Sequence, residues 1–168
     1  MLALGEFALL RQHMEQSLET PGQPIKNGSM AHEHSVYMML ADSAAQAGDE
    51  SVLRKYAPLL EELALRDQHR PYLAVAHRAW GVAHRLAGEY AEAEMRLNKA
   101  LEMFEGLQAR WQIGRTLAEL AALAQAGIDP DRAQAYLTQA LSNFEAIGAT
   151  PDVERIRRVL ETVSKPGN

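Results

Sequence analysis

The sequence repeats itself at a spacing of forty residues, and this feature constrains the fold more than any other. Ala93 aligns with Ala133, and Leu97 aligns with Leu137, without a gap between them. Further pairs at this spacing are Ala100 and Ala140, Leu101 and Leu141, Phe104 and Phe144, Glu105 and Glu145, and Ala109 and Ala149. A period of this length is typical of chains in which each unit buries its apolar face against its neighbours. We therefore expect a linear stack of similar units.

Weaker copies of the unit lie on both sides of this core. Gly48 and Asp49 align with Gly88 and Glu89 at the same spacing. The first residues show only the second half of a unit, and residues 153–163 show only a first half. We therefore expect an array that starts and ends in mid-repeat, which suggests a piece of a longer protein.

Each unit is predicted to be a pair of helices. Ala, Leu, Glu, Arg and Gln dominate the sequence and favour helices, whereas no long stretch alternates with the period of two that strands require. Asp129 before Pro130 and Thr150 before Pro151 are typical helix starts. Left-handed residues are expected where helices stop, at Gly48, Gly88 and Gly127. The predicted helices cover residues 3–19, 32–47, 50–66, 71–87, 90–105, 110–126, 130–146 and 151–163. Pro58 should kink the third of these or split it.

The chain is therefore predicted to form a single all-α domain of about eight helices over residues 1–168. Its predicted parts are a partial repeat (1–19), a loop rich in Pro and Gly (20–31), three repeats (32–70, 71–110 and 111–150), and a terminal helix with a tail (151–168).

The repeat resembles the tetratricopeptide family. The family pairs a large–small step in the first helix, here Trp80-Gly81, with small residues one and two turns apart in the second, here Ala93 and Ala100. The resemblance implies a right-handed α-solenoid, in which Gly81 or Ala121 lets the paired helices approach closely. The forty-residue period resembles the long arrays of bacterial signal-transduction ATPases and maltose-regulator-like transcriptional activators. The implied function is protein–protein interaction within such a signalling protein.

In this family the first helix of each pair lines a concave groove, which is where a partner is expected to bind. The resemblance places nine main candidates on this wall: Met38, Asp42, Arg78, Val82, Arg85, Arg115, Gln125, Arg155 and Arg158. Ser35, Val75, Ala118, Ala122 and Thr162 are expected beside them. The arginines would form a basic strip able to grip the carboxylates of a protein or peptide. The alternative is a solvated face whose arginines pair with nearby Glu and Asp.

Two other functions remain open. The terminal helices have apolar sides, with Phe7, Leu10 and Met14 at one end and Ile156 and Leu160 at the other, and these sides could pair two copies into a homodimer. A helical enzyme using a small molecule or a metal is the other alternative, and it would need His77 or His84 in a buried polar pocket with further ligands. The seven-residue spacing of these histidines favours packing positions instead, so we expect no catalytic residue and no metal or cofactor.

Composition narrows the classes of partner. The net charge is −5, from 17 basic and 22 acidic residues, which does not favour direct binding to nucleic acid. No apolar run approaches the roughly 20 residues that span a membrane. The absence of cysteine excludes thiol chemistry and fits a reducing compartment. We expect a cytoplasmic protein.

Overall fold

The computed structural model describes residues 4–19 and 29–163, and describes side chains for residues 9–16 and 34–163. Over this part the chain forms eight helices and no strand, which confirms the all-α prediction. The helices are α1 (Leu4–Glu19), α2 (Ser29–Ala47), α3 (Glu50–Arg66), α4 (Arg70–Leu86), α5 (Tyr90–Gly106), α6 (Arg110–Ala126), α7 (Pro130–Glu145) and α8 (Thr150–Val163). None of these helices combines the length and apolarity needed to cross a bilayer.

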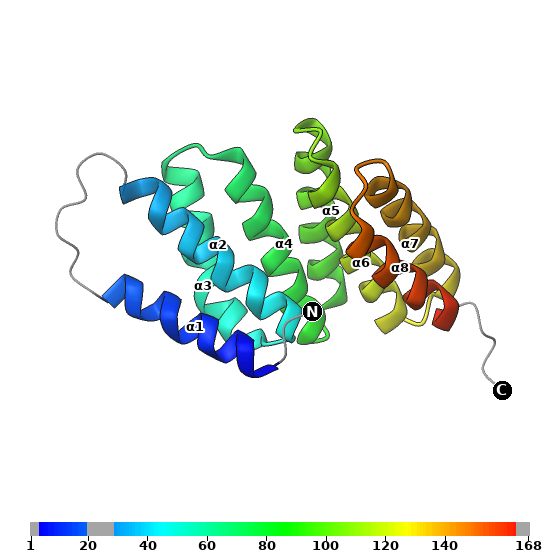
Figure 1. Cartoon of the computed structure of the whole chain (residues 1–168), viewed down its shortest axis with the longest axis horizontal. Helices are drawn as coiled ribbons and strands as arrows, with labels where there is room; N and C mark the ends of the chain where they lie inside the picture. The colour runs from blue at the N-terminus through cyan, green and yellow to red at the C-terminus, as the bar shows by residue number, and fades with distance from the viewer. Residues whose placement is uncertain (1–3, 20–28, 164–168) are drawn as a thin grey trace.

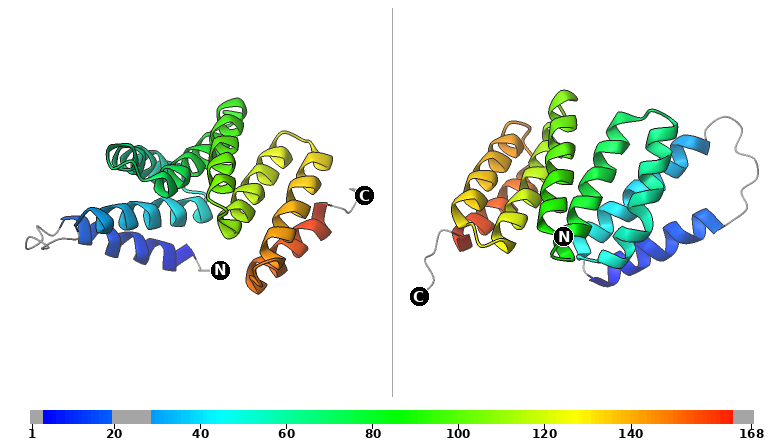
Figure 2. Two further views of the ribbon diagram at one scale, coloured as in Figure 1. Left: turned by 90° about the horizontal axis from the view of Figure 1, so that it is seen from above. Right: turned by 180° about the vertical axis from the view of Figure 1, so that it is seen from behind.

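The helices stack side by side in an elongated array, with α1 to α3 towards one end and α7 and α8 at the other (Figure 1). Each helix packs against the next along the chain, and the even-numbered helices also meet, α2 with α4 and α4 with α6. Two further views show the same order of neighbours (Figure 2). The even-numbered helices therefore form a continuous face made of the first helix of each pair.

A left-handed residue follows nearly every helix at a spacing of twenty residues. These residues are Gly48, Gln68, Gly88, Gln108, Ile128 and Gly148. In these turns the amide after the left-handed residue donates back across the helix end, as from Asp129 N to the carbonyl of Ala124 at 2.9 Å. The prediction of a left-handed Gly127 was wrong. That glycine has a φ of −81° and ends α6, and the left-handed position falls on Ile128, with a φ of 61°.

The paired helices α4 and α5 approach closely at Gly81. A Cβ at this position would lie 2.5 Å from Cγ of Leu97 and 3.2 Å from its backbone nitrogen. No side chain fits there, as the large–small step predicts. A second close approach, at Gly114 against the ring of Phe144, follows the same logic between α6 and α7, and the sequence alone did not reveal it.

Pro58 lies inside α3, which runs without interruption from Glu50 to Arg66. Of the two predicted outcomes, a kink or a split at Pro58, the split is therefore wrong. Proline removes one amide donor from the helix, but Tyr56, Ala57 and Leu60 around it are buried in the core. Packing on both sides of the proline holds the two turns in one helix.

Candidate functional site on the even-numbered helices

Asp42 joins three successive helix pairs on the face of even-numbered helices. Its Oδ1 lies 3.1 Å from Nη2 of Arg78 on α4, and its Oδ2 lies 2.7 Å from Nη1 of Arg115 on α6. Nη1 of Arg78 also donates to Oε1 of Gln112 at 2.6 Å. One carboxylate on α2 thus fixes the positions of α4 and α6.

The charges in this cluster depend on one another. Burial opposes ionisation of Asp42, but the attraction of Arg78 and Arg115 outweighs it and lowers the pKa of Asp42 below its ordinary value of 3.8. Burial also lowers the pKa of Arg78, and Asp42 opposes that effect. The Arg78 side chain is only 3% exposed and its guanidinium lies 5.3 Å from the centre of the Phe104 ring. A buried arginine so enclosed needs its carboxylate partner.

A second layer of contacts surrounds this cluster towards α8. Nε1 of Trp111 donates to Oδ2 of Asp152 at 3.0 Å, and Nη2 of Arg155 donates to the other oxygen of Asp152 at 3.1 Å. The guanidinium of Arg115 lies over the Trp111 ring at 4.8 Å. Nη2 of Arg85 donates to Glu119 at 3.1 Å. Trp111 therefore links α6 to α8 across the face.

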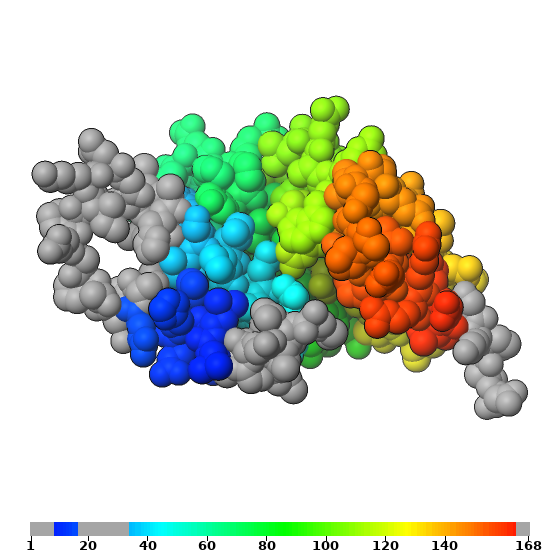
Figure 3. Space-filling view, in the orientation of Figure 1, coloured from blue at the N-terminus to red at the C-terminus, as the bar shows by residue number. Residues whose placement is uncertain are grey.

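A cavity of about 350 Å³ opens among these side chains, formed by α2, α4, α6 and α8. Arg85, Arg115, Arg155 and Trp111 line it together with the carboxylates of Glu119 and Asp152. Figure 3 views the molecule with α2 in cyan and α8 in red on either side of this face. Ala118 and Ala122, which the repeat pattern also predicted to face the groove, lie in the cavity wall. The small alanines leave space between the long polar side chains.

Three of the predicted groove residues do not offer the surface expected of them. Val82 is fully buried and Val75 nearly so, because both pack into the core cluster that α4 shares with its neighbours. Arg78 is on this face but is enclosed by Asp42, Gln112 and Phe104, so it cannot grip an external carboxylate. These three residues therefore lie beneath the face of even-numbered helices and support the side chains that are exposed on it.

The other predicted groove residues lie outside the cavity lining. Met38 is half-buried and packs on the core, whereas Gln125 and Thr162 are exposed. The hydroxyl of Ser35 lies 3.3 Å from that of Tyr72. Arg158 is exposed, and its Nε donates to the backbone carbonyl of Glu154 at 3.3 Å. Of the five arginines predicted to form a basic strip, three line the cavity: Arg85, Arg115 and Arg155.

The terminal helices bury part of the apolar sides that were expected to be free to pair two copies. Ile156 is buried against its own chain, so it is not available to a second copy, contrary to the prediction. Leu160 is half-buried against the same cluster, and Leu10 and Met14 on α1 are also half-buried. The side chain of Phe7 lies outside the described residues. The sequence could not show that α8 turns Ile156 inward onto α7.

The two histidines on α4 make separate contacts. Nδ1 of His77 lies 2.9 Å from Nη1 of Arg96, and burial lowers the pKa of His77, with the Arg96 charge adding to the effect. Nδ1 of His84 lies 2.5 Å from Oε2 of Glu89. Over the described residues, no three His, Cys, Asp or Glu side chains are grouped to hold a metal ion.

The predicted groove residues did not include Glu119 and Asp152, although these two carboxylates organise the outer layer. Each binds an arginine of the predicted strip. Helical spacing indicates the pairing of Asp152 with Arg155, which lie three residues apart on α8, but nothing in the repeat pattern indicates that Glu119 would meet Arg85. The register between α4 and α6 decides the pairing of Glu119 with Arg85.

Comparison with known proteins supports the fold alone. No family model matches the sequence, and no curated protein matches it. Among solved structures, the chain is similar to the crystal structure of BtubC (BKLC) from P. vanneervenii, a helical protein, with a TM-score of 0.57. The two are 16% identical, and the match covers 98% of this chain and 77% of that one.

Proposed function

We propose that this chain is a protein-interaction module of the tetratricopeptide type that binds an extended acidic segment of a partner protein. The observation that carries the proposal is the cavity on the face of even-numbered helices, where Arg85, Arg115 and Arg155 converge beside Trp111. Helix pairs that begin forty or forty-one residues apart, and the close approach at Gly81, support the tetratricopeptide assignment.

The balance of charge favours an acidic ligand. The cavity lining contains three arginines and two carboxylates, Glu119 and Asp152, so its net charge is 3 − 2 = +1, on a protein whose net charge is −5. A guanidinium has five N–H donors. Arg85 uses Nη2 towards Glu119, Arg155 uses Nη2 towards Asp152, and Arg115 uses Nη1 towards Asp42 behind the cavity. The remaining donors can grip carboxylates of a bound segment, while Trp111 offers an apolar surface beside them.

A peptide selection followed by affinity measurement tests the proposal. Random peptides displayed on phage are selected on the full chain, and we expect the recovered peptides to be rich in Asp and Glu. The affinity of one selected peptide is then measured by fluorescence anisotropy for the wild type and for Arg155→Glu. Because a hydrogen bond to a charged group contributes about 1.5–3 kcal/mol, the substitution should weaken binding by about tenfold or more.

The matched control is Arg157→Glu on the same helix. Arg157 is also exposed and ion-paired, but its partner is Glu145 on α7, at 2.7 Å, and it does not line the cavity. Both substitutions change the net charge equally. The proposal is rejected if the selected peptides are not acidic, or if the two variants weaken binding to the same extent.

The cellular setting belongs to the same proposal. We place the chain as a regulatory segment of a larger bacterial signalling or transcription protein in the cytoplasm. The long repeat period and the absence of cysteine support this placement.

A further inference from the structure

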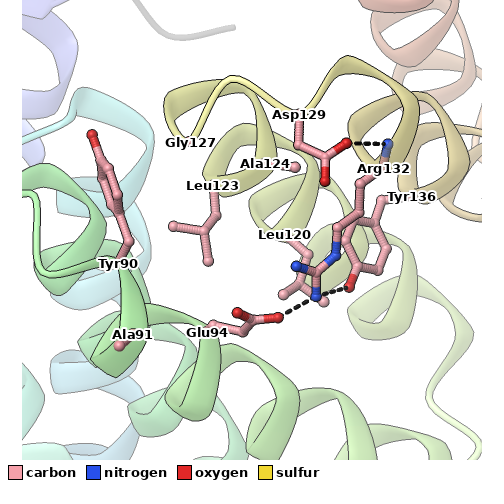
Figure 4. A pocket seen from close by; sticks show the side chains of 10 residues that line it. All are labelled: Tyr90, Ala91, Glu94, Leu120, Leu123, Ala124, Gly127, Asp129, Arg132 and Tyr136. Carbon is pink, nitrogen blue, oxygen red and sulfur yellow. Dashed lines mark hydrogen bonds and ion pairs between the residues drawn. The ribbon is translucent and has the colours of Figure 1, made fainter.

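A second cavity, of about 360 Å³, opens between α5, α6 and α7 (Figure 4), and its lining shares no residue with that of the first cavity. Leu120, Leu123 and Ala124 form its apolar wall. Across from them, Arg132 bonds both to Glu94 and to the hydroxyl of Tyr136. The cavity therefore combines an apolar wall with a polar rim.

The repeat explains why this cavity exists. Helices α6 and α7 begin forty residues after α4 and α5, at Arg110 and Pro130 against Arg70 and Tyr90. The cavity residues Leu120 and Ala124 therefore correspond to Trp80 and His84 in the preceding pair.

In the preceding pair two aromatic side chains occupy the equivalent place. The rings of Trp80 and His84 stack with their centres 5.6 Å apart. Nε1 of Trp80 donates to Oε2 of Glu61 at 2.8 Å, and the Arg96 guanidinium lies 5.7 Å from the Trp80 ring. Replacement of both rings by the much smaller Leu120 and Ala124 leaves the space open one unit later.

The rim suits an indole rather than an anion. Glu94 and Asp129 supply carboxylates and Arg132 supplies one cation, so the lining has a net charge of 1 − 2 = −1. This balance disfavours an acidic group and offers acceptors to an N–H donor. Arg132 also offers a cation for the face of a ring, as Arg96 does for Trp80.

A strained residue stands beside the opening. Ile128, between the cavity residues Gly127 and Asp129, is 89% exposed and has a φ of 61°. A β-branched residue in this conformation is an outlier, and the conformation itself is the one that the turn adopts at every twenty-residue interval. The strained turn holds an apolar side chain in solvent next to an apolar cavity.

We propose that this cavity binds a tryptophan side chain of a partner protein, whose indole takes the place that Trp80 and His84 fill in the preceding pair. The bound ring packs on Leu123 and Ala124, its N–H points to a rim carboxylate, and Ile128 covers its edge. This site is separate from the arginine-lined cavity, so the failure of one proposal leaves the other standing.

The test uses N-acetyl-tryptophanamide as the probe and N-acetyl-leucinamide as its control. Amide resonances of the full ¹⁵N-labelled chain are followed while each compound is added. We expect the tryptophan compound to shift the resonances around Leu123, Gly127 and Arg132 with a Kd of about 1 mM, as befits a single side chain. The leucine compound should shift them little. Equal shifts with both compounds, or shifts elsewhere only, would overturn the proposal.

Variants with a filled cavity, and one control variant, decide whether the probe binds in this cavity. Leu120→Trp combined with Ala124→His transfers the residues of the preceding pair, and it should abolish binding. If that double variant does not fold, Ala124→Phe alone must abolish it. The reciprocal variant, His84→Ala, enlarges the space beside Trp80 and must leave probe binding at the Leu123 site unchanged. Persistent binding in a folded variant with the cavity filled overturns the proposal.

Discussion

Replacing Ile128 with glycine should stabilise the protein. The left-handed conformation costs a residue with a Cβ about 1–2 kcal/mol, and glycine avoids this cost. The added backbone entropy of glycine in the unfolded chain offsets about 0.4–1 kcal/mol. Little burial is lost because the Ile128 side chain is 89% exposed. The net gain is about 0–1.6 kcal/mol, and its midpoint of about 0.8 kcal/mol corresponds to a rise in Tm of roughly 2–3 °C for a chain of this length.

Thermal unfolding followed by circular dichroism measures this gain, and Gly88→Ala supplies the reciprocal control. Gly88 is the equivalent residue one unit earlier, has a φ of 78°, and a Cβ there would meet nothing within 4 Å. That substitution should therefore destabilise the protein through backbone conformation alone. A Tm that falls in Ile128→Gly would show that the Ile128 side chain contributes contacts that outweigh its strain, and it would refute this reasoning.

Other perturbations test the packing and the buried charges. Gly81→Ala places a methyl group against Leu97 and should lower the free energy of unfolding, measured in urea, by about 1–3 kcal/mol. The control is Gly106→Ala, where a Cβ meets nothing, and it should be neutral or stabilising. Equal effects of the two substitutions would contradict the close approach at Gly81. Asp42→Asn leaves the buried Arg78 without its carboxylate and should cost about 3–5 kcal/mol at neutral pH. Because the fold lowers the pKa of Asp42, its stabilisation is present above pH 3.8 and is lost as the pH falls through the folded value. The stability difference between wild type and variant should shrink over that range, and a difference independent of pH would be inconsistent with an ionised Asp42.

The helices were predictable because local signals agree with the repeat. Asp129 before Pro130 marks the start of α7, and its Oδ1 accepts from the Arg132 amide at 3.0 Å as a capping residue does. The predicted and observed bounds of α5, α6 and α7 differ by a residue or less. Pro58 is the exception, because burial of the residues around it outweighs a local preference that the sequence expresses clearly.

The candidate site was only partly predictable. Helical spacing places Arg78 and Arg85 on the same face, but it does not say that Arg78 lies beneath the surface while Arg85 borders a cavity. The difference comes from Asp42, which reaches Arg78 from a helix thirty-six residues away. Such pairing depends on how neighbouring units are rotated, and no pattern within a single helix records that rotation.

The regular placement of left-handed residues has a consequence for how such a chain can lengthen. The left-handed residues of the reversals recur at intervals of twenty residues, so a tandem copy of residues 89–128 inserted after Ile128 would begin and end in phase. Each added copy would bring its own turns and would lengthen the face of even-numbered helices. The Asp42 cluster would be left as it is, because its members all precede the insertion. Growth by whole units would thus extend the surface that meets a partner without disturbing the charges that anchor the first pairs.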